Sequence, residues 1–113
     1  MDFVLRKRGS FYCLDIKKKT FDADLMKKIT FFIKDNIKNT HWLALNLKHV
    51  EEFDRGETVS SICGCGVNLY GLNPILSMQL SLLSPKKFPP VYVSEDDFIQ
   101  SKRMLARRRF RVV

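Results

Sequence analysis

A short apolar run at residues 42–47 (WLALNL) constrains the fold of this chain more than any other feature. The run is long enough for one strand, and it is apolar on both faces instead of alternating. Such a strand is typical of a sheet that is covered by helices. The chain then turns polar and reaches residues 53–57 (FDRGE), just ahead of a short predicted helix. Because strand ends and the following helix starts form the usual working edge of an open α/β sheet, we expect any functional site there.

The other elements alternate between strand and helix patterns. Two β-prone runs at residues 3–7 and 11–16 predict a hairpin that turns at Gly9, and in the second run Tyr12, Leu14 and Ile16 share one face. Apolar residues at helical spacing predict a helix over residues 22–39, capped by Asp22 or Thr20. The later signals are a helix at 57–63, a strand at 67–72, a helix starting at Asn73-Pro74, a linker at 86–90, a strand at 91–93 and a final helix capped by Ser94. The order ββαβαβαβα predicts an α/β fold, with a mostly parallel or mixed sheet of about five strands and helices packed against it.

Composition limits the class of protein. A length of 113 residues with 45% hydrophobic and 28% charged residues predicts one globular domain and excludes a disordered chain. No apolar segment approaches the roughly 18 residues that a membrane-spanning helix needs. The first ten residues (MDFVLRKRGS) show no apolar signal core. We therefore expect a cytoplasmic protein.

The positive charge is concentrated at one end. The net charge is +8, and residues 102–113 carry six bases and no acid. The rest of the chain has 14 bases against 12 acids, a net charge of +2. We therefore divide the chain into a domain at 1–106 and a basic tail at 107–113. An alternative function is binding of nucleic acid or an anionic membrane surface by the arginines of this tail, which are Arg107, Arg108, Arg109 and Arg111. The simpler interpretation is that the tail is a solvated terminus.

Three segments, taken in order, resemble the motifs of one family. Residues 45–56 (LNLKHVEEFDRG) resemble the pattern LDLSxVxFIDSSG, residues 67–74 (VNLYGLNP) resemble VxLxGLSP, and residues 90–98 (PVYVSEDDF) resemble VFxSxEEAL. These are patterns of the STAS domain, the fold of bacterial anti-sigma-factor antagonists and of the cytoplasmic ends of sulfate transporters. The sequence is thus similar to a STAS domain over nearly its whole length.

The resemblance implies a non-catalytic module that binds a protein partner, of the anti-sigma-factor, kinase-like or transporter-associated kind. In regulated members, a Ser or Thr directly after the Asp of the first motif accepts phosphate, and this modification switches partner affinity. Here Arg55 and Gly56 follow Asp54, and neither carries a hydroxyl. We therefore expect no phosphoswitch at the usual position. The interval from Asp54 to Pro74 is also shorter than the family norm, which predicts a truncated second helix.

The predicted partner-binding residues follow the buried strand. They are Glu52, Asp54, Arg55, Gly56, Glu57 and Thr58. Fixed charges here would select a partner without control by phosphate. The plainer alternative is a turn in which Asp54 caps the short helix and Gly56 relieves the backbone. Thr58, Ser60 and Ser61 are nearby hydroxyls at which a displaced phosphosite could lie.

The cysteines and histidines give a second alternative, a thiol redox protein. Cys63-Gly64-Cys65 could be a redox pair or half of a metal site, but a zinc site needs four ligands and a reactive thiol needs a lowered pKa. Cys13, His41 and His49 stand at no recognised ligand spacing, and no nucleophile, base and orienting group form a known pattern. We expect structural cysteines, no metal, no cofactor and no catalytic residues.

Overall fold

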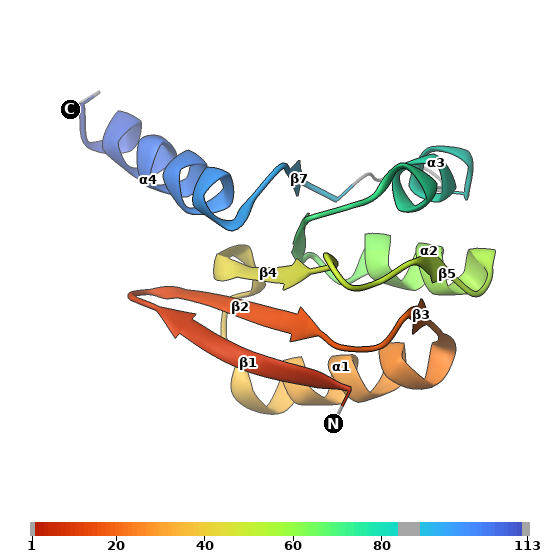
Figure 1. Cartoon of the computed structure of the whole chain (residues 1–113). Helices are drawn as coiled ribbons and strands as arrows, with labels where there is room; N and C mark the ends of the chain where they lie inside the picture. The colour runs from red at the N-terminus through yellow and green to blue at the C-terminus, as the bar shows by residue number, and fades with distance from the viewer. Residues whose placement is uncertain (1, 84–88, 112–113) are drawn as a thin grey trace.

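Five strands form the central sheet, in the order β1-β2-β4-β6-β7. The computed structural model describes residues 2–83 and 89–111, without the side chains of residues 83 and 105–111. In chain order the elements are β1 (Phe3–Arg8), β2 (Phe11–Ile16), β3 (Thr20–Phe21), α1 (Ala23–Asn36), the 3₁₀ helix η1 (Thr40–Trp42), β4 (Leu43–Asn46), β5 (Glu52–Phe53), α2 (Gly56–Gly64), β6 (Asn68–Tyr70), α3 (Pro74–Leu83), β7 (Val91–Tyr92) and α4 (Glu95–Arg111). Figure 1 shows the hairpin β1–β2 leading into this arrangement. The predicted α/β order is confirmed, and two short strands, β3 and β5, are additional.

The sheet is mixed, as predicted. β1 pairs with β2 antiparallel, and the pairs β2–β4, β4–β6 and β6–β7 are parallel. Gly9 turns the hairpin in the left-handed region, at φ 61°, where an L side chain would be strained. No helix in the described ranges is long and apolar enough to cross a membrane.

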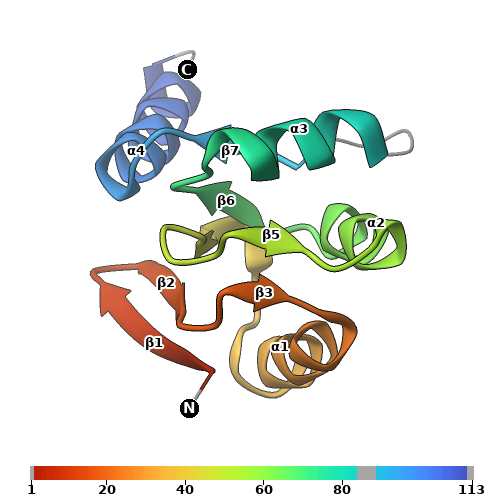
Figure 2. The same cartoon turned by 45° about the vertical axis from the view of Figure 1, so that its right-hand side comes forward.

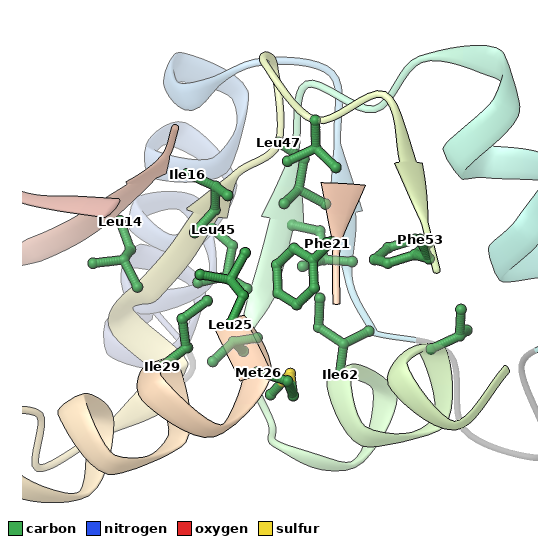
Figure 3. Packing of buried hydrophobic residues seen from close by; sticks show 14 of the residues in the cluster. Leu14, Ile16, Phe21, Leu25, Met26, Ile29, Leu45, Leu47, Phe53 and Ile62 are labelled. Carbon is green, nitrogen blue, oxygen red and sulfur yellow. The ribbon is translucent and has the colours of Figure 1, made fainter. Parts of the chain in front are cut away.

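Helices cover both faces of β4. Leu43 and Leu45 are fully buried in the main core, which also contains Leu25 and Ile29 of α1 (Figure 3). Ala44 points to the other face and packs in a smaller cluster with side chains of α4. An interior strand with apolar side chains on both faces needs a layer of helices on each face to exclude water. The apolar run in the sequence therefore accounts for the two helical layers.

The same division of faces holds in β2. Leu14 and Ile16 lie in the main core with Tyr12 packed against it, whereas Phe11 and Cys13 belong to the cluster under α4. The predicted face assignment for this strand is therefore confirmed.

The predicted helix at residues 22–39 is too long. Asp22 is the N-cap, and its carboxylate accepts from the amide of Leu25 at 2.9 Å, as expected. The helix ends at Asn36 because Ile37 adopts an extended backbone. Asn39 belongs to the next element, where its side chain accepts from the amide of His41 and caps η1. The other predicted bounds shift by one or two residues, and the predicted linker at 86–90 falls largely on residues outside the described ranges.

A second, two-stranded sheet was not predicted. β3 and β5 pair in parallel, with Phe21 opposite Phe53, and they lie side by side between α1 and α3 (Figure 2). The two phenylalanine rings meet edge to face at 5.6 Å between centroids, and both side chains are buried. The side-chain amide of Gln79 in α3 bonds the backbone of β5 at Phe53. Its oxygen accepts from the Phe53 N–H at 2.9 Å, and its nitrogen donates to the Phe53 carbonyl at 3.0 Å.

An ion-pair network joins the hairpin to the start of α4. Arg6 lies between Asp15 and Glu95, and Arg8 also binds Glu95. The Tyr70 hydroxyl donates to the same Glu95 carboxylate at 3.0 Å. Burial alone raises the pKa of Glu95, but the hydrogen bonds from Arg8 and Arg6 outweigh it and hold this pKa at about 2. Glu95 is therefore charged, and the network holds the start of α4 against its face of the sheet.

Candidate functional site

The predicted binding loop, residues 52–58, connects β5 to the first turn of α2. Its entry is fixed on both sides, because Phe53 is bonded to Gln79 and the Asp54 amide donates to the Phe21 carbonyl at 3.1 Å. The strand that brings the chain to this loop is thus part of the small second sheet. The loop itself is held as a defined backbone and not as a free connection.

Asp54 and Thr58 are joined inside the loop. The Thr58 hydroxyl donates to the Asp54 carboxylate at 2.5 Å, and Thr58 is only 2% exposed. This hydrogen bond is the main cause that lowers the pKa of Asp54, with a smaller contribution from Arg55 at 3.4 Å. A charged acceptor strengthens such a bond, so the pair locks the turn between β5 and α2.

The interpretation of Asp54 as the cap of the short helix is wrong. The N-cap of α2 is Arg55, which has an extended backbone and makes no side-chain cap bond. The Asp54 carboxylate instead reaches over the cap to a side chain in the first turn.

Three charged residues of the loop, Glu52, Arg55 and Glu57, are exposed, whereas Phe53 and Thr58 are buried. The side chain of Asp54 is only 22% exposed. The six predicted residues therefore divide into three that present charge to solvent, the bonded pair Asp54 and Thr58 that holds the turn, and Gly56, which begins α2.

A groove of about 610 Å³ runs between α1 and α2, next to this loop. It is lined from α1 by Ala23, Met26, Lys27, Thr30 and Phe31, and from the loop and α2 by Arg55, Glu57, Thr58, Ser61, Gly64 and Cys65. Phe31 is 68% exposed, which is unusual for a phenylalanine on a surface helix. Charged side chains at the loop end and an exposed aromatic ring therefore share one concave surface.

Sequence reasoning did not find the contribution of α1 to this surface. Phe31 lies outside the apolar stripe from which α1 was predicted, on the side of the helix that also carries lysines. An aromatic residue on this polar side was the sequence signal for a surface site. Gln79 gave no signal, because its partner is the backbone of a two-residue strand distant in sequence.

A second groove, of about 490 Å³, lies where β4 and β6 end, beside the start of α4. Its polar residues are bonded to one another: Asn46 donates to Asp15 at 2.9 Å and accepts from the Lys48 amide at 3.0 Å. Among the described residues, every buried side-chain nitrogen and oxygen has a hydrogen-bond partner. Asn46, Tyr70 and Glu95 of this groove are therefore each hydrogen-bonded within the protein.

Cys13 and Cys65 lie in surroundings that do not activate a thiol. None of the three cysteines forms a disulfide, and Cys13 and Cys63 are buried. Burial raises the pKa of Cys65 and raises that of Cys13 to about 12, which is the direction opposite to that of a reactive thiolate. Within residues 2–83 and 89–111, no three His, Cys, Asp or Glu side chains are grouped so that they could hold a metal ion.

The histidines and the basic tail stand apart from the loop. His41 lies in η1, with its Nδ1 at 3.2 Å from the Nζ of Lys102, and His49 lies in the turn after β4. The backbone of residues 107–111 continues α4, but the side chains of Arg107, Arg108, Arg109 and Arg111 lie outside the described ones. Anion binding by these arginines stays a prediction.

Comparison with known proteins identifies the fold. No family model matches the sequence, and no curated protein matches it. Among solved structures, the chain is similar to a serine-to-glutamate variant of RsbS from Moorella thermoacetica, with a TM-score of 0.65, 13% identity, and coverage of 95% of this chain and 99% of that one. It is also similar to a protein described as an anti-sigma factor antagonist from Thermotoga maritima, with a TM-score of 0.64, 16% identity, and coverage of 89% and 94%.

These similarities confirm the STAS-like fold that the three sequence motifs indicated. At such low identity they concern the fold, and function has to be argued from the residues of this chain.

Proposed function

We propose that this STAS-like domain is a regulatory module that binds a protein partner through residues 52–58 and α2, without catalysing a reaction. The observation that carries the proposal is the fixed loop, which places the charged residues Arg55 and Glu57 in the lining of an apolar groove. The names of the structural neighbours, RsbS and an anti-sigma factor antagonist, support a regulatory partner protein. The groove would take apolar side chains of the partner, and the charged loop would select among partners.

The residues of this site fit partner binding that is not controlled by phosphorylation. Arg55 and Gly56 follow Asp54, so the position of the usual phosphoacceptor has no hydroxyl. Thr58 cannot replace it in the folded state, because its hydroxyl is buried and donated to Asp54. Ser60 is exposed, and the Ser61 hydroxyl donates to the Glu57 carbonyl. We infer constitutive binding that is set by the fixed charges of Arg55 and Glu57.

The test begins with isolation of the bound partner from the source cells and measurement of its affinity with purified chains. Arg55→Ala and Glu57→Ala are each expected to weaken binding at least tenfold, because the residues flank the groove. Lys34→Ala and Asp35→Ala serve as controls, since they remove exposed charges of the same signs from the other end of α1. Full affinity in both loop variants would disprove this surface.

A further inference from the structure

A pocket rich in lysine lies at the edge of the central sheet where β2 and β4 end. These two strands are parallel neighbours, so their carboxyl ends meet at one edge, to which both arrowheads point in Figure 1. Ligands of open α/β sheets bind at this kind of edge. The pocket has a volume of about 590 Å³ and adjoins the groove beside α4, with which it shares Lys48. Its polar lining, which we call the lysine pocket, consists of Lys17, Lys19, Lys48, His49, Glu51 and Asn73.

Hydrogen bonds fix the backbone around the lysine pocket. The Glu51 amide donates to the Lys19 carbonyl at 2.7 Å, which joins the turn after β4 to the loop after β2. The side-chain amide of Asn73 donates to the carbonyls of Val50 at 3.2 Å and of Glu51 at 3.1 Å. The loops that carry the lysines are thus held in place without a ligand, and such preorganisation lowers the entropic cost of binding.

The lysine amines are not neutralised by acids of the protein. Lys17, Lys19 and Lys48 are exposed, and none of them forms an ion pair with a described carboxylate, in contrast to Lys18, which binds Asp22. Among the described lining residues, three lysines stand against one glutamate, which gives a net charge of +2 (3 − 1). A hollow lined by uncompensated charge of one sign concentrates ions of the other sign.

We propose that the lysine pocket binds a small oligophosphate, a free compound with two or more linked phosphate groups. Several ammonium groups around one hollow suit an anion with several charges, and lysine binds phosphate oxygens as a point charge. The start of α3 adds to this preference, because Asn73 accepts from the Leu76 amide and the N-terminus of a helix favours negative charge.

The lining also separates this ligand from related ones. Among the described lining residues there is no Phe, Tyr or Trp on which a nucleotide base could stack. The aliphatic residue of the lining, Val50, is only 2% exposed, so the pocket offers no apolar surface to a lipid bilayer. The phosphate groups themselves are therefore the part of the ligand that is recognised.

The test is calorimetric titration of the full chain with inorganic triphosphate. At about 50 mM salt the dissociation constant should be on the order of 0.1 mM, and it should rise at least fivefold at about 0.5 M salt, because the amines are exposed to screening. In NMR spectra, the amides of residues 17–19 and 48–51 should shift. ATP should bind no more tightly than triphosphate. Absence of heat and of these shifts up to about 10 mM triphosphate would overturn the proposal.

Matched variants separate the pocket from the general charge of the protein. The double variant Lys19→Gln/Lys48→Gln should weaken triphosphate binding about tenfold, and Lys48→Arg, which keeps the charge, should change it little. Lys38→Gln is the control, because it removes an exposed lysine ahead of η1, at the opposite end of β4. Equal weakening per lost charge at all three positions would mean attraction by net charge alone and would overturn the site.

The basic tail is the competing phosphate site. It follows a 17-residue helix that starts at the same edge of the sheet, which places the tail roughly 25 Å away, beyond the range of strong electrostatic coupling. Replacement of Arg107, Arg108, Arg109 and Arg111 by Gln should therefore change triphosphate affinity less than about twofold. Binding that is lost in this variant but kept in the double lysine variant would overturn the proposal. Lysine-dependent binding to phosphoinositide vesicles, without binding of triphosphate, would overturn it as well.

The lysine pocket does not depend on the proposed function. It uses no residue of the 52–58 loop or of α2, so loss of triphosphate binding in the double lysine variant should leave partner affinity unchanged.

Discussion

The Thr58 hydroxyl joins the two ends of the turn between β5 and α2. Thr58→Val keeps the packing volume but removes the hydroxyl that donates to Asp54 at 2.5 Å. The pKa of Asp54 should rise towards its ordinary value of 3.8, since this hydrogen bond is the main cause of the lowering. Loss of the bond should lower the free energy of unfolding by about 1 kcal/mol near pH 7.

Titration of the Asp54 carboxyl by NMR measures the effect. Thr58→Ser is the control, because it retains the hydroxyl and should keep the pKa low. The sign follows from linkage: a lowered carboxyl pKa contributes stability above the unfolded pKa, and that contribution is lost as pH falls through the folded pKa. An unchanged Asp54 pKa in the valine variant would refute the role assigned to Thr58.

Glu95 should make the protein sensitive to acid. Its pKa is about 2 in the folded chain against an ordinary value of 4.5. Its contribution to stability should therefore be present above about pH 4.5 and be lost as pH falls towards 2. Glu95→Gln should lower the free energy of unfolding by about 2 kcal/mol near pH 7, an amount reduced by the exposure of both arginines.

Urea unfolding of the two chains across this pH range measures the difference. The gap between wild type and Glu95→Gln should close as the pH approaches 2. Asp97→Asn changes an exposed acid in the same helical turn and should shift stability by less than about 0.5 kcal/mol. A gap that stays constant with pH would mean that packing, and not the ion pairs of Arg6 and Arg8, explains the loss.

Among the elements, α3 is hydrogen-bonded to β5 through the side chain of Gln79. Gln79→Met keeps the length of the side chain but leaves both polar groups of Phe53 without this partner. We expect a loss of about 1–3 kcal/mol in the free energy of unfolding and faster amide exchange at Phe53. Gln79→Glu retains an oxygen acceptor for the N–H and should show the smaller effect. Wild-type exchange at Phe53 in the methionine variant would contradict this role.

The elements with strong periodic signals could be predicted from the sequence. Leu25, Ile29 and Ile33 gave α1, and the apolar run at 42–47 gave a strand buried on both faces. The end of α1 could not be found, because Asn39 is a favourable residue for a cap as well as for the end of a helix, and only the backbone of Ile37 decides between them. β3 and β5 were missed because two-residue strands carry no period, and their pairing depends on the tertiary fold.

Residues 52–58 were proposed as a site from the sequence because a loop after a buried strand is the usual working edge of such a sheet. In the structure the short strand β5 of the second sheet lies between the buried strand β4 and this loop. The groove could not be predicted, because it depends on how closely α1 and α2 approach one another. Phe31 departs from the amphipathic pattern of α1, and this could be seen in the sequence. Only the structure shows that it lines the same groove as Arg55 and Gly64.

In the molecule as a whole, charge is unevenly distributed along the chain. The 52–58 loop carries both signs beside the groove, α3 carries none, and residues 102–113 carry six bases without an acid. The described side chains by which α4 packs on the sheet include Phe98, Ile99 and Lys102, and all of them precede residue 107. We therefore expect the helix to hold its place on the sheet without the last arginines.

A chain that ends at residue 106 should consequently remain as stable as the full chain. Its free energy of unfolding should differ by less than about 0.5 kcal/mol, because no described core residue is removed. The deletion removes four arginines and no acid, so the net charge falls from +8 to +4. If the tail binds phosphates, affinity for a short DNA duplex should fall, and its slope against log salt should decrease by as much as about 4. A loss of several kcal/mol would instead place residues 107–113 within the folded domain.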